Sequence, residues 1–368
     1  MLLLTPGPLT TSPATRAALT ADHGSRDPAF LALSGRVREG LRAVVAAPAD
    51  GYTCVPVQGS GSFGVEAALG SFIPRDRPLV VGVNGAYGAR IVEMARRIGH
   101  AVEVVAAPET EPLSPASLAA RLALHPRPGW VAWVAHETTT GLVNPNEALA
   151  AVARAAGWRT FVDAMSAYGA LPMHAQGLRF DVLVASANKL LEGVPGVAFA
   201  VVADDALAAA PGHPGSLVLD LVDQARRLAQ DGQWRFTPPT HVLAALDAAL
   251  AQHAAEGGAA GRLARYSANR DVLVAGMREM GFETLLPDAL LGPVIVTFRT
   301  PGHPAWEFEA FYAGLVARGF AIYPGKLTAA PSFRVGCIGQ VFPADMRRFL
   351  AAVRAVLDAA GVPSGAPA

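Results

Sequence analysis

Short runs of apolar residues, rich in valine, alternate with helical patterns through the first two-thirds of this 368-residue chain. Continuous apolar runs of this length are typical of strands that are buried on both faces, as in a parallel sheet. The alternation therefore predicts an α/β fold with a doubly wound, mainly parallel sheet. The runs are PLVVGV (78–83), AVEVV (101–105), GWVAWVA (129–135), RTFVDA (159–164), DVLVA (181–185) and VAFAVV (197–202).

The segment 146–157 has the pattern of a crossover helix between two of these runs. Asn146 is placed to cap its start, and Gly157 follows its end. Apolar residues recur at the spacing of one helical face, at Leu149, Val152, Ala153 and Ala156.

The pattern changes beyond about residue 255, and a length prior of roughly 150 residues per domain suggests about two domains. We expect a large domain over residues 12–255 and a smaller α+β domain formed by 1–11 and 256–368. Its last residues, GVPSGAPA (361–368), are expected to be a disordered tail. The expected elements of this part are a helix around 261–280, strands near 292–299, 319–325 and 333–339, and a last helix around 343–360.

Charge and composition exclude several classes of function. Thirty acidic and thirty basic side chains balance, which removes the electrostatic case for a nucleic-acid or membrane partner and leaves a small-molecule ligand. Spanning helices need runs of about 18 apolar residues, which the sequence lacks. The start, MLLLTPGPLTT, lacks a basic leader, so we expect no secretory signal, a mature chain that begins there and a cytoplasmic location.

The two cysteines, Cys54 and Cys337, occur without a C-x-x-C motif or a neighbouring histidine cluster. Such isolated cysteines are most simply small buried residues in a reducing compartment. We therefore expect neither a disulfide framework nor a metal site.

The stretch QGSGSFGVEAAL (58–69) contains a G-x-G-x-x-G motif at Gly59, Gly61 and Gly64, between a strand-like run and a helical run. The dinucleotide fingerprint also expects an acidic residue about 20 positions later, at the end of the second strand. Here that strand is followed by NGAYG (84–88), so half of the fingerprint is missing. Free N–H groups and hydroxyls at the start of a helix still suit a phosphate, the alternative being a tight structural turn.

Lys189 is one of only two lysines, the other being Lys326, whereas 28 of the 30 basic residues are arginine. It follows a strand-like run, so it should lie at the carboxyl edge of the sheet, where open α/β folds bind ligands. Arginine cannot lose its proton, whereas lysine, with a reference pKa of about 10.4, can be desolvated until its amine attacks a carbonyl. The position favours Schiff-base chemistry over a stray surface lysine.

Asp163 ends the run RTFVD, 26 residues before Lys189 and about one strand–helix–strand step away. Both side chains can then meet at the same sheet edge. A carboxylate there would keep a pyridine nitrogen protonated, which pyridoxal phosphate needs in order to act as an electron sink. The phosphate loop, Lys189 and Asp163 together predict this cofactor. Lys326 has no such strand one step upstream and is the weaker candidate for the amine.

Three further side chains occur in polar turns or strand-like segments of the chain. Thr138, in HETTTG (136–141), could hydrogen-bond the ring hydroxyl of the cofactor or belong to a strand-end turn. Tyr87 could stack on the ring or be a core aromatic residue. Arg334 could bind an anionic substrate group bidentately or form a surface ion pair.

With these residues in place, the chain resembles the class V aminotransferases of pyridoxal-phosphate fold type I over nearly its whole length. Within that family it is most similar to the branch that acts on 2-aminoethylphosphonate and pyruvate. The segments SANKLLEGVPG (186–196) and WRFTPPTH (234–241) are specific to this branch. The likeness also runs through LLLTPGPLTTS (2–12), residues 51–69, NGAYGAR (84–90), HETTTG (136–141), VDAMSAYGALPM (162–173) and IYPGK (322–326).

The resemblance implies a role for each candidate residue. Lys189 would bond the cofactor and Asp163 would contact its pyridine nitrogen, with Thr138 at the ring and Arg334 on the substrate anion. The family pattern also implies a homodimer with shared active sites. Its residues at the cofactor phosphate would be Ser60, Gly61 and Ser62, together with Thr237 and Thr240 of the neighbouring subunit.

The implied reaction is transamination of 2-aminoethylphosphonate with pyruvate, giving phosphonoacetaldehyde and L-alanine. Ser25, Arg26 and Asp27 look more like the alanine–glyoxylate and serine transaminase branch, which makes a class V transaminase of alanine or serine with glyoxylate the nearest alternative. A cysteine desulfurase would need a mobile cysteine, whereas Cys337 lies in a strand-like run. An NAD-dependent oxidoreductase rests on the glycine motif alone, and a binding protein would require Lys189 to be dispensable.

Overall fold

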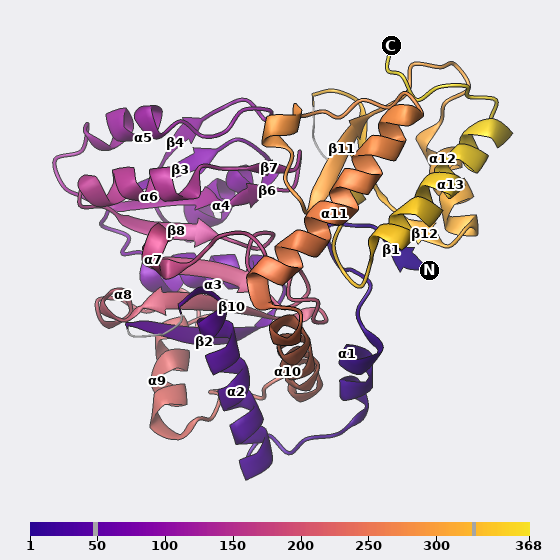
Figure 1. Cartoon of the computed structure of the whole chain (residues 1–368). Coiled ribbons are helices and arrows are strands. Elements are labelled where there is room, and N and C mark those ends of the chain that lie inside the picture. Colours follow the sequence, from indigo (N-terminus) through magenta and orange to yellow (C-terminus); the bar gives the residue numbers. More distant parts are fainter. Residues whose placement is uncertain (47–50, 326–328) are drawn as a thin grey trace.

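The computed structural model of the chain describes residues 1–46, 51–325 and 329–368. Lys326, the weaker of the two lysine candidates, lies outside the described residues. A large sheet flanked by helices occupies one part of the molecule, and a smaller group of strands and helices lies beside it (Figure 1).

Within the described residues, the large sheet has seven strands in the order β2-β10-β9-β8-β5-β3-β4. β10 runs antiparallel to both of its neighbours, and the remaining pairs are parallel. The predicted mainly parallel sheet is confirmed, and each apolar run became a strand within one residue at either end. The strands are β2 (Tyr52–Gly59), β3 (Leu79–Val83), β4 (Val102–Ala106), β5 (Trp130–Val134), β8 (Arg159–Asp163), β9 (Val182–Ser186) and β10 (Gly196–Ala203).

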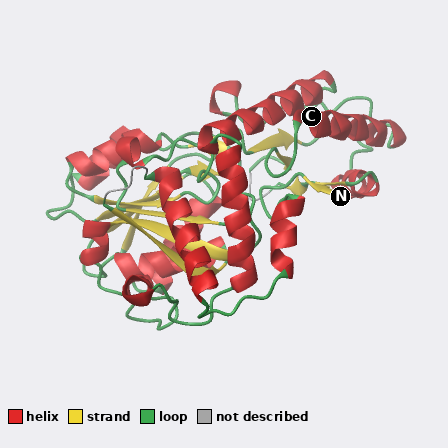
Figure 2. Ribbon diagram, turned by 60° about the horizontal axis from the view of Figure 1, so that its bottom comes forward, coloured by secondary structure: helices red, strands yellow, loops and turns green. Residues whose placement is uncertain are grey.

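Helices cover both faces of this sheet, which is why its strands read as continuous apolar runs (Figure 2). Along β5, Val131 and Trp133 join the core on one face, while Ala132 and Val134 join the core on the other. One face packs against α2 (Pro28–Val45), α5 (Pro115–Leu122), α6 (Asn146–Ala155) and α10 (Thr240–Ala255), and the other against α3 (Gly61–Phe72), α4 (Ala86–Arg97) and α9 (Leu221–Asp231).

The predicted crossover helix is α6, but Asn146 does not cap it. Pro145 occupies the cap position and Asn146 is the first helical residue. The Asn146 side chain instead accepts a hydrogen bond from Trp133 Nε1 at 2.8 Å and donates to the Ala135 carbonyl at 3.2 Å. A buried indole N–H needs an acceptor, and this requirement outweighs capping. Ala156, expected on the buried face, is exposed.

The C-terminal region has its own antiparallel sheet, in the order β11-β14-β13 within the described residues, and its own hydrophobic core. The N-terminal strand β1 (Leu2–Leu3) pairs with β12 (Phe320–Ala321) in the same region, so the chain returns to its start (Figure 1). Its elements are α11 (Gly258–Glu279), β11 (Ile295–Arg299), α12 (Phe308–Ala317), β13 (Tyr323–Pro324), β14 (Ser332–Gly336) and α13 (Pro343–Ala359).

The expectation of a disordered tail over 361–368 is wrong. Val362 is only 1% exposed and belongs to the C-terminal core. The backbone N–H of Gly365 donates to the Met280 carbonyl at 2.8 Å, and the Ala366 carbonyl accepts from Gly302 at 2.8 Å. The tail is therefore ordered by backbone partners far away in the sequence, which a local composition rich in Gly and Pro does not reveal.

Cys54 and Cys337 are free and buried, as predicted. They lie in different cores, Cys54 beside the large sheet and Cys337 in the C-terminal region. A search of the described residues finds no helix that is long and apolar enough to span a membrane. The same residues contain no group of three or more potential metal-ligating side chains.

Candidate active site

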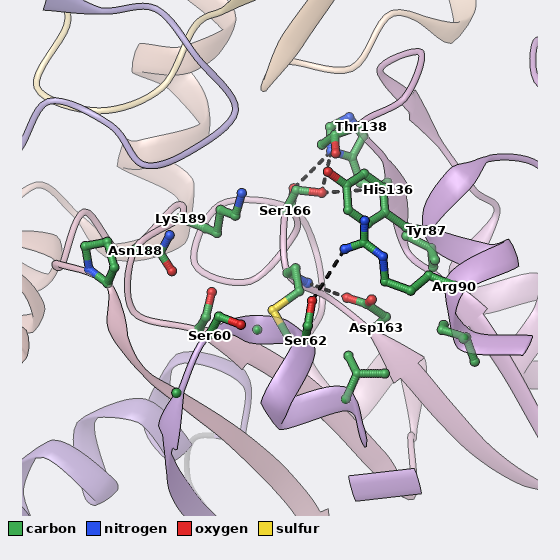
Figure 3. A pocket seen from close by; sticks show the side chains of 18 of the residues that line it. Ser60, Ser62, Tyr87, Arg90, His136, Thr138, Asp163, Ser166, Asn188 and Lys189 are labelled. Carbon is green, nitrogen blue, oxygen red and sulfur yellow. Dashed lines mark hydrogen bonds between the residues drawn. The ribbon is translucent and has the colours of Figure 1, made fainter. Parts of the chain in front are cut away.

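Polar residues that follow the strands of the large sheet gather at its carboxyl edge, as expected for an open α/β fold. They line a cavity of about 440 Å³ (Figure 3). Seven of the residues predicted for the site line this cavity, namely Ser60, Gly61, Ser62, Tyr87, Thr138, Asp163 and Lys189. Further lining residues, which the sequence reasoning did not assign, include Arg90, His136, Met165, Ser166, Ser186 and Asn188.

Lys189 lies in a tight turn just after β9. The Lys189 carbonyl accepts a hydrogen bond from Glu192 N at 2.8 Å, which closes the turn. Its amine extends toward the N-terminal segment, where Nζ donates to the Pro6 carbonyl at 2.8 Å. Gly7 has φ +123°, and a Cβ there would lie 2.7 Å from Nζ. The backbone around Gly7 therefore approaches the amine closely, which the sequence reasoning missed.

Asp163 is the last residue of β8 and is 5% exposed. Its Oδ1 accepts a hydrogen bond from Met165 N at 3.0 Å. Burial raises the pKa of this carboxyl to about 6, although the Met165 hydrogen bond and the charges of Lys189 and Arg90 oppose the shift. The structure thus brings a buried carboxyl group and the lysine amine to the same cavity, at the carboxyl ends of neighbouring strands.

The glycine motif forms the turn between β2 and α3. Ser60 occupies the cap position of α3, but its hydroxyl makes no capping hydrogen bond within the described helix. A Cβ on Gly64 would lie 2.7 Å from the Ala198 Cβ, so this glycine lets α3 pack closely against β10. The first N–H groups of a helix attract anions, and here they face a cavity that also contains the Ser60 and Ser62 side chains.

Ser186 ends β9 and lines the same cavity. Its side chain is buried, and its Oγ has no hydrogen-bond partner among the described residues. Because a buried hydroxyl normally finds a partner, this atom marks a place where a ligand group can bind.

The start of α4 is fixed by the loop after β5. Glu137 Oε2 accepts hydrogen bonds from Tyr87 N at 3.1 Å and Gly88 N at 3.3 Å, and Thr139 Oγ1 accepts from Ala86 N at 3.1 Å. Glu137 is fully buried, and burial raises its pKa while these hydrogen bonds lower it. This loop therefore caps α4 from outside the helix and fixes the position of Tyr87 at the cavity.

Arg90 is an unassigned cation in the cavity. Its guanidinium carbon lies 5.0 Å from the centre of the Tyr87 ring, and Nη1 donates to Ser62 Oγ at 3.4 Å. The signal for this residue was present in NGAYGAR, since Arg90 follows Tyr87 by three positions on one helix and therefore shares its face.

Arg334, on β14, is 4% exposed, so the alternative of a surface ion pair is wrong. Nη1 donates to the Thr138 carbonyl at 3.1 Å, and Nε donates to the Pro324 carbonyl at 3.0 Å. Burial lowers the pKa of the guanidinium, whereas the neighbouring tyrosines raise it. Among the described residues, no carboxylate forms an ion pair with this buried cation.

His136 and Ser166, which were not predicted as site residues, lie together at the cavity wall. His136 Nδ1 lies 3.0 Å from the Ser166 carbonyl, and Ser166 Oγ donates to the His136 carbonyl at 2.8 Å. Burial lowers the pKa of His136 to about 4, so its ring is neutral at neutral pH.

The two threonines predicted for the neighbouring subunit lie outside the Lys189 cavity of their own chain. Thr237 lines an adjoining groove with Gly59, Phe63 and Phe236, and Thr240 begins α10. Gly59 lines both the groove and the cavity. The segment 25–27, which resembles the glyoxylate branch, is exposed in the loop before α2.

Comparison with known proteins shows the family of the chain. The family described as Aminotransferase class-V matches residues 25–347. A curated relative, the 2-aminoethylphosphonate–pyruvate transaminase of Burkholderia ambifaria, is 50% identical over 363 residues, which are 98% of this chain and 96% of that protein.

Two solved structures share the fold at 26% sequence identity. The pyridoxamine–pyruvate aminotransferase of Mesorhizobium loti matches with a TM-score of 0.90, covering 99% of this chain and 95% of that chain. The alanine–glyoxylate aminotransferase of Nostoc sp. matches with a TM-score of 0.89, covering 97% and 95%. The predicted fold class and family are confirmed, and the chain belongs to the class V aminotransferases.

Proposed function

We propose that this chain is a pyridoxal-phosphate-dependent aminotransferase that transfers the amino group of 2-aminoethylphosphonate to pyruvate, giving phosphonoacetaldehyde and L-alanine. The observation that carries this proposal is the meeting of the Lys189 amine and the buried Asp163 carboxyl in one cavity, with the buried Arg334 guanidinium hydrogen-bonded to the carbonyl of Thr138 in the cavity wall. The close similarity to the Burkholderia ambifaria transaminase supports this choice of substrates.

The residues present fit pyridoxal phosphate. A phosphate could accept hydrogen bonds from the first N–H groups of α3 and from the Ser60 hydroxyl, which does not cap that helix. The Ser186 hydroxyl, which has no hydrogen-bond partner among the described residues, is a further donor. The buried Asp163 carboxyl would face a protonated ring nitrogen, a positive charge that would favour its ionised form against the effect of burial. When bound, the cofactor supplies an electron sink to the carbon that bears the amino group.

Each predicted residue then has a proposed role. Asp163 holds the ring nitrogen, Thr138 contacts the ring region, Tyr87 packs against the ring, and Lys189 bonds the cofactor. The cofactor phosphate is held by Ser60, Gly61 and Ser62.

Lys189 also moves the proton that transamination requires. In its neutral form, Nζ removes the proton from the substrate carbon that bears the amine, and its protonated form would then deliver that proton to the carbon of the cofactor. The reaction needs an amine that is neutral at one step and protonated at the next, which a lysine can provide. Arginine at this position would stay protonated.

Arg334 binds the anionic group of each substrate in turn. Its guanidinium is buried without a carboxylate partner among the described residues, so an incoming phosphonate or carboxylate would neutralise a charge that is otherwise uncompensated. Bidentate geometry suits both groups. Its hydrogen bond to the Thr138 carbonyl holds it beside the cavity.

The active enzyme is proposed to be a homodimer in which Thr237 and Thr240 reach the cofactor phosphate of the partner. The groove beside the cavity carries exposed apolar side chains, with Phe63 54%, Val218 64% and Phe236 50% exposed. An apolar surface of this kind next to a catalytic cavity suits a second copy of the chain. Within each chain, residues 12–255 and the region formed by 1–11 and 256–368 would be two domains, since each has its own core.

The competing reactions have weaker support. A cysteine desulfurase needs a reactive thiolate, but Cys337 is fully buried and burial raises its pKa to about 12. A dinucleotide needs an acidic residue after β3, where the buried Asn84 hydrogen-bonds Asn144 instead. Transamination with glyoxylate is the remaining alternative and is compared directly in the assay below.

The test combines spectroscopy with a choice of amino donors. Purified protein loaded with pyridoxal phosphate should absorb visible light, and 2-aminoethylphosphonate should shift that band. Alanine should form from pyruvate only with this donor, and replacing Lys189 with Ala should remove both the band and the activity. An unchanged band in the Lys189→Ala variant, or faster turnover of alanine or serine with glyoxylate, would overturn the proposal.

A further inference from the structure

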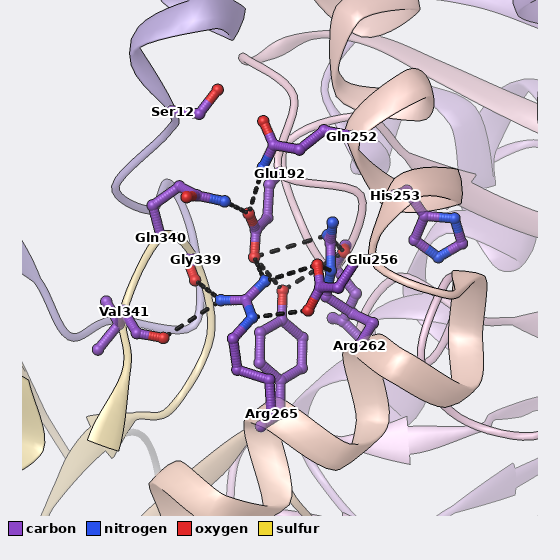
Figure 4. Close-up of polar contacts among 12 residues, drawn as sticks. Ser12, Glu192, Gln252, His253, Glu256, Arg262, Arg265, Gly339, Gln340 and Val341 are labelled. Atoms are coloured by element: carbon purple, nitrogen blue, oxygen red, sulfur yellow. Dashed lines mark hydrogen bonds and ion pairs between the residues drawn. The ribbon is translucent and has the colours of Figure 1, made fainter. Parts of the chain in front are cut away.

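A network of charged side chains surrounds Glu192, three residues after Lys189 (Figure 4). At its centre is Glu192, which is 1% exposed and has φ +62°, in the left-handed region that non-glycine residues rarely adopt. Arg265 Nη2 donates to Glu192 Oε1 at 2.7 Å, and Arg262 Nη1 lies 3.5 Å from the same oxygen. Strained backbone and a buried charge at one residue both have to be compensated by their surroundings.

Residues of the network form hydrogen bonds with the backbone of the turn that contains Lys189. Glu192 N donates to the Lys189 carbonyl at 2.8 Å, and Arg262 Nη1 donates to the Leu190 carbonyl at 2.5 Å. Tyr266 Oη donates to Glu192 Oε1 at 2.6 Å. The turn that presents the lysine is therefore fastened to α11, which begins the C-terminal region.

The other side of the network holds the turn 339–341, which follows β14, the strand of Arg334. Gln340 Nε2 donates to Glu192 Oε2. Arg265 Nη1 donates to the carbonyls of Gly339 and Val341. Glu192 thus connects the Lys189 turn on one side to the strand of the substrate-binding arginine on the other.

The N-terminal segment also connects the turn 339–341 to Lys189. The backbone N–H of Gln340 donates to the Thr10 carbonyl at 2.8 Å. Four residues earlier, the Pro6 carbonyl accepts a hydrogen bond from Lys189 Nζ. The turn 339–341 is therefore fastened to the surroundings of Lys189 by both a side chain and the backbone.

We propose that Glu192 is a positioning residue, whose carboxylate couples the Lys189 turn to the Arg334 strand and so sets the distance between the reacting amine and the guanidinium that binds the substrate anion. The inference rests on the proposed function of Arg334. Glu192 is not among the residues that line the Lys189 cavity, so it acts through the two segments that it joins. Misplacement of a reacting group by about 1 Å can lower the rate on the order of 100-fold.

The chain offers a matched pair of glutamines for the test. Gln340, in the turn after β14, donates a short hydrogen bond to Glu192 Oε2, and Gln252, on α10, donates a longer one of 3.5 Å to the same oxygen. Both are partly exposed, and neither carries a charge. Replacing Gln340 with Ala removes a link to the Arg334 strand, whereas replacing Gln252 with Ala removes a link within the large-sheet region.

The variants are compared as full-length holoenzymes with 2-aminoethylphosphonate and pyruvate. For Gln340→Ala we expect kcat/KM to fall about tenfold with each substrate, a modest part of the loss that misplacement can cause. Gln252→Ala should stay close to wild type. Equal effects of the two variants would mean that Glu192 only stabilises its own turn, and would overturn the proposal.

Hydrogen–deuterium exchange in the cofactor-free protein gives a readout that is independent of turnover. Gln340→Ala should speed exchange both in residues 187–193 and in residues 332–341, because the two segments are coupled. Faster exchange in the second segment alone would contradict coupling. If wild-type enzyme failed to turn over 2-aminoethylphosphonate while exchange in both segments still rose together, the proposed function would fall and the mechanical coupling would stand.

The carboxylate itself is tested with Glu192→Gln, which keeps the size of the side chain. Within the described residues it leaves Arg262 and Arg265 with Glu256 as their one acidic partner. We expect a loss of kcat/KM at least as large as that of Gln340→Ala. Wild-type kcat/KM in a folded Glu192→Gln enzyme would refute the role of the carboxylate. If this variant does not fold, the glutamine pair decides the question.

Discussion

At the scale of single residues, the candidate site is defined by ionisable groups whose charge is opposed by burial. Asp163 and Arg334 are 5% and 4% exposed, and burial shifts the pKa of each toward its neutral form. Neither has an oppositely charged side chain in an ion pair among the described residues. Groups of this kind reduce stability unless a ligand compensates them, which is typical of functional sites.

Asp163 makes a prediction about stability and pH. Because its folded-state pKa of about 6 exceeds the ordinary value of 3.8, the folded protein binds the proton more tightly than the unfolded chain. Stability of the cofactor-free protein should therefore fall as pH rises from about 4 to about 6, by at most roughly 3 kcal/mol at 1.36 kcal/mol per pKa unit. Asp163→Asn should be more stable than wild type at pH 8, yet inactive.

The measurement is denaturant unfolding of cofactor-free wild type and Asp163→Asn at pH 5 and pH 8. The stability difference should have about half of its full size at pH 5, because the carboxyl of the unfolded chain is already ionised above its ordinary pKa of 3.8, and it should reach its full size at pH 8. A difference that does not depend on pH would show that Asp163 does not titrate in this range.

Arg334 makes a prediction about substrate affinity. Removing its charge with Arg334→Gln should weaken binding of both anionic substrates by roughly 10- to 100-fold, since charge-assisted hydrogen bonds contribute about 1.5–3 kcal/mol. Arg334→Lys should recover only part of the loss, because an ammonium group cannot bind bidentately. Steady-state kinetics for each substrate measure this, and an unchanged KM for 2-aminoethylphosphonate would place the phosphonate elsewhere.

At the scale of elements, α4 is held by side chains from another part of the chain. Thr139 Oγ1 accepts a hydrogen bond from Ala86 N, the first residue of the helix, and donates to Glu137. The neighbouring Thr140 is equally buried, but its hydroxyl has no partner within the described residues. Two adjacent threonines thus differ in what their hydroxyls do.

Because of this difference, replacement by valine should affect the free energy of unfolding differently at the two positions. Thr139→Val should lower the free energy of unfolding by about 1–2 kcal/mol, because it removes a helix cap and leaves a buried donor without its acceptor. Thr140→Val should be neutral or stabilising, because it replaces an unsatisfied hydroxyl with a methyl group. Urea unfolding of the two variants measures the contrast, and equal losses would argue against the capping role of Thr139.

The elements also show how far the sequence determines the structure. The strands of the large sheet were predictable because burial on both faces leaves an apolar run in the sequence itself. Asn146 was predicted to cap α6, because asparagine is a common capping residue. Its side chain instead accepts a hydrogen bond from the Trp133 indole, a partner that the sequence does not reveal. The ordered tail and the cap of α4 depend on hydrogen-bond partners far away in the chain. Local sequence patterns do not reveal such partners.

Some residues of the candidate site could likewise be predicted from the sequence, and others could not. Lys189 and Asp163 were predictable, because strand ends in a parallel sheet meet at one edge. Arg90 could have been found from its spacing to Tyr87 on one helix. The approach of Pro6 and Gly7 to the lysine could not, because it depends on how the N-terminal segment packs against the rest of the molecule.

At the scale of the whole molecule, the cavity and the groove of Thr237 lie side by side on one chain. If Thr237 serves the partner subunit, two inactive variants should complement each other. A dimer of one Lys189→Ala chain and one Thr237→Ala chain contains one site in which both residues are native. Each mixed dimer should have about half of the wild-type turnover, and because random subunit exchange of equal amounts makes about half of the dimers mixed, the whole mixture should recover roughly a quarter.

The control is each variant mixed with itself, which should stay as inactive as before. No recovery in dimers shown to be mixed by mass would place Thr237 in the site of its own chain. A charge introduced into the groove with Phe236→Asp should shift the protein from dimer toward monomer in sedimentation. A dimer unaffected by that charge would place the interface on another face.

The pairing of Leu2 and Leu3 with Phe320 and Ala321 has a consequence for synthesis. Chains are made from the N-terminus at roughly 5–20 residues per second, so Leu2 must wait on the order of 15–60 s for its partner strand to leave the ribosome. During that time the segment that will face the Lys189 amine has no strand to pair with. A nascent chain can complete its large sheet early, but it can assemble its site only after Phe320 and Ala321 have been made.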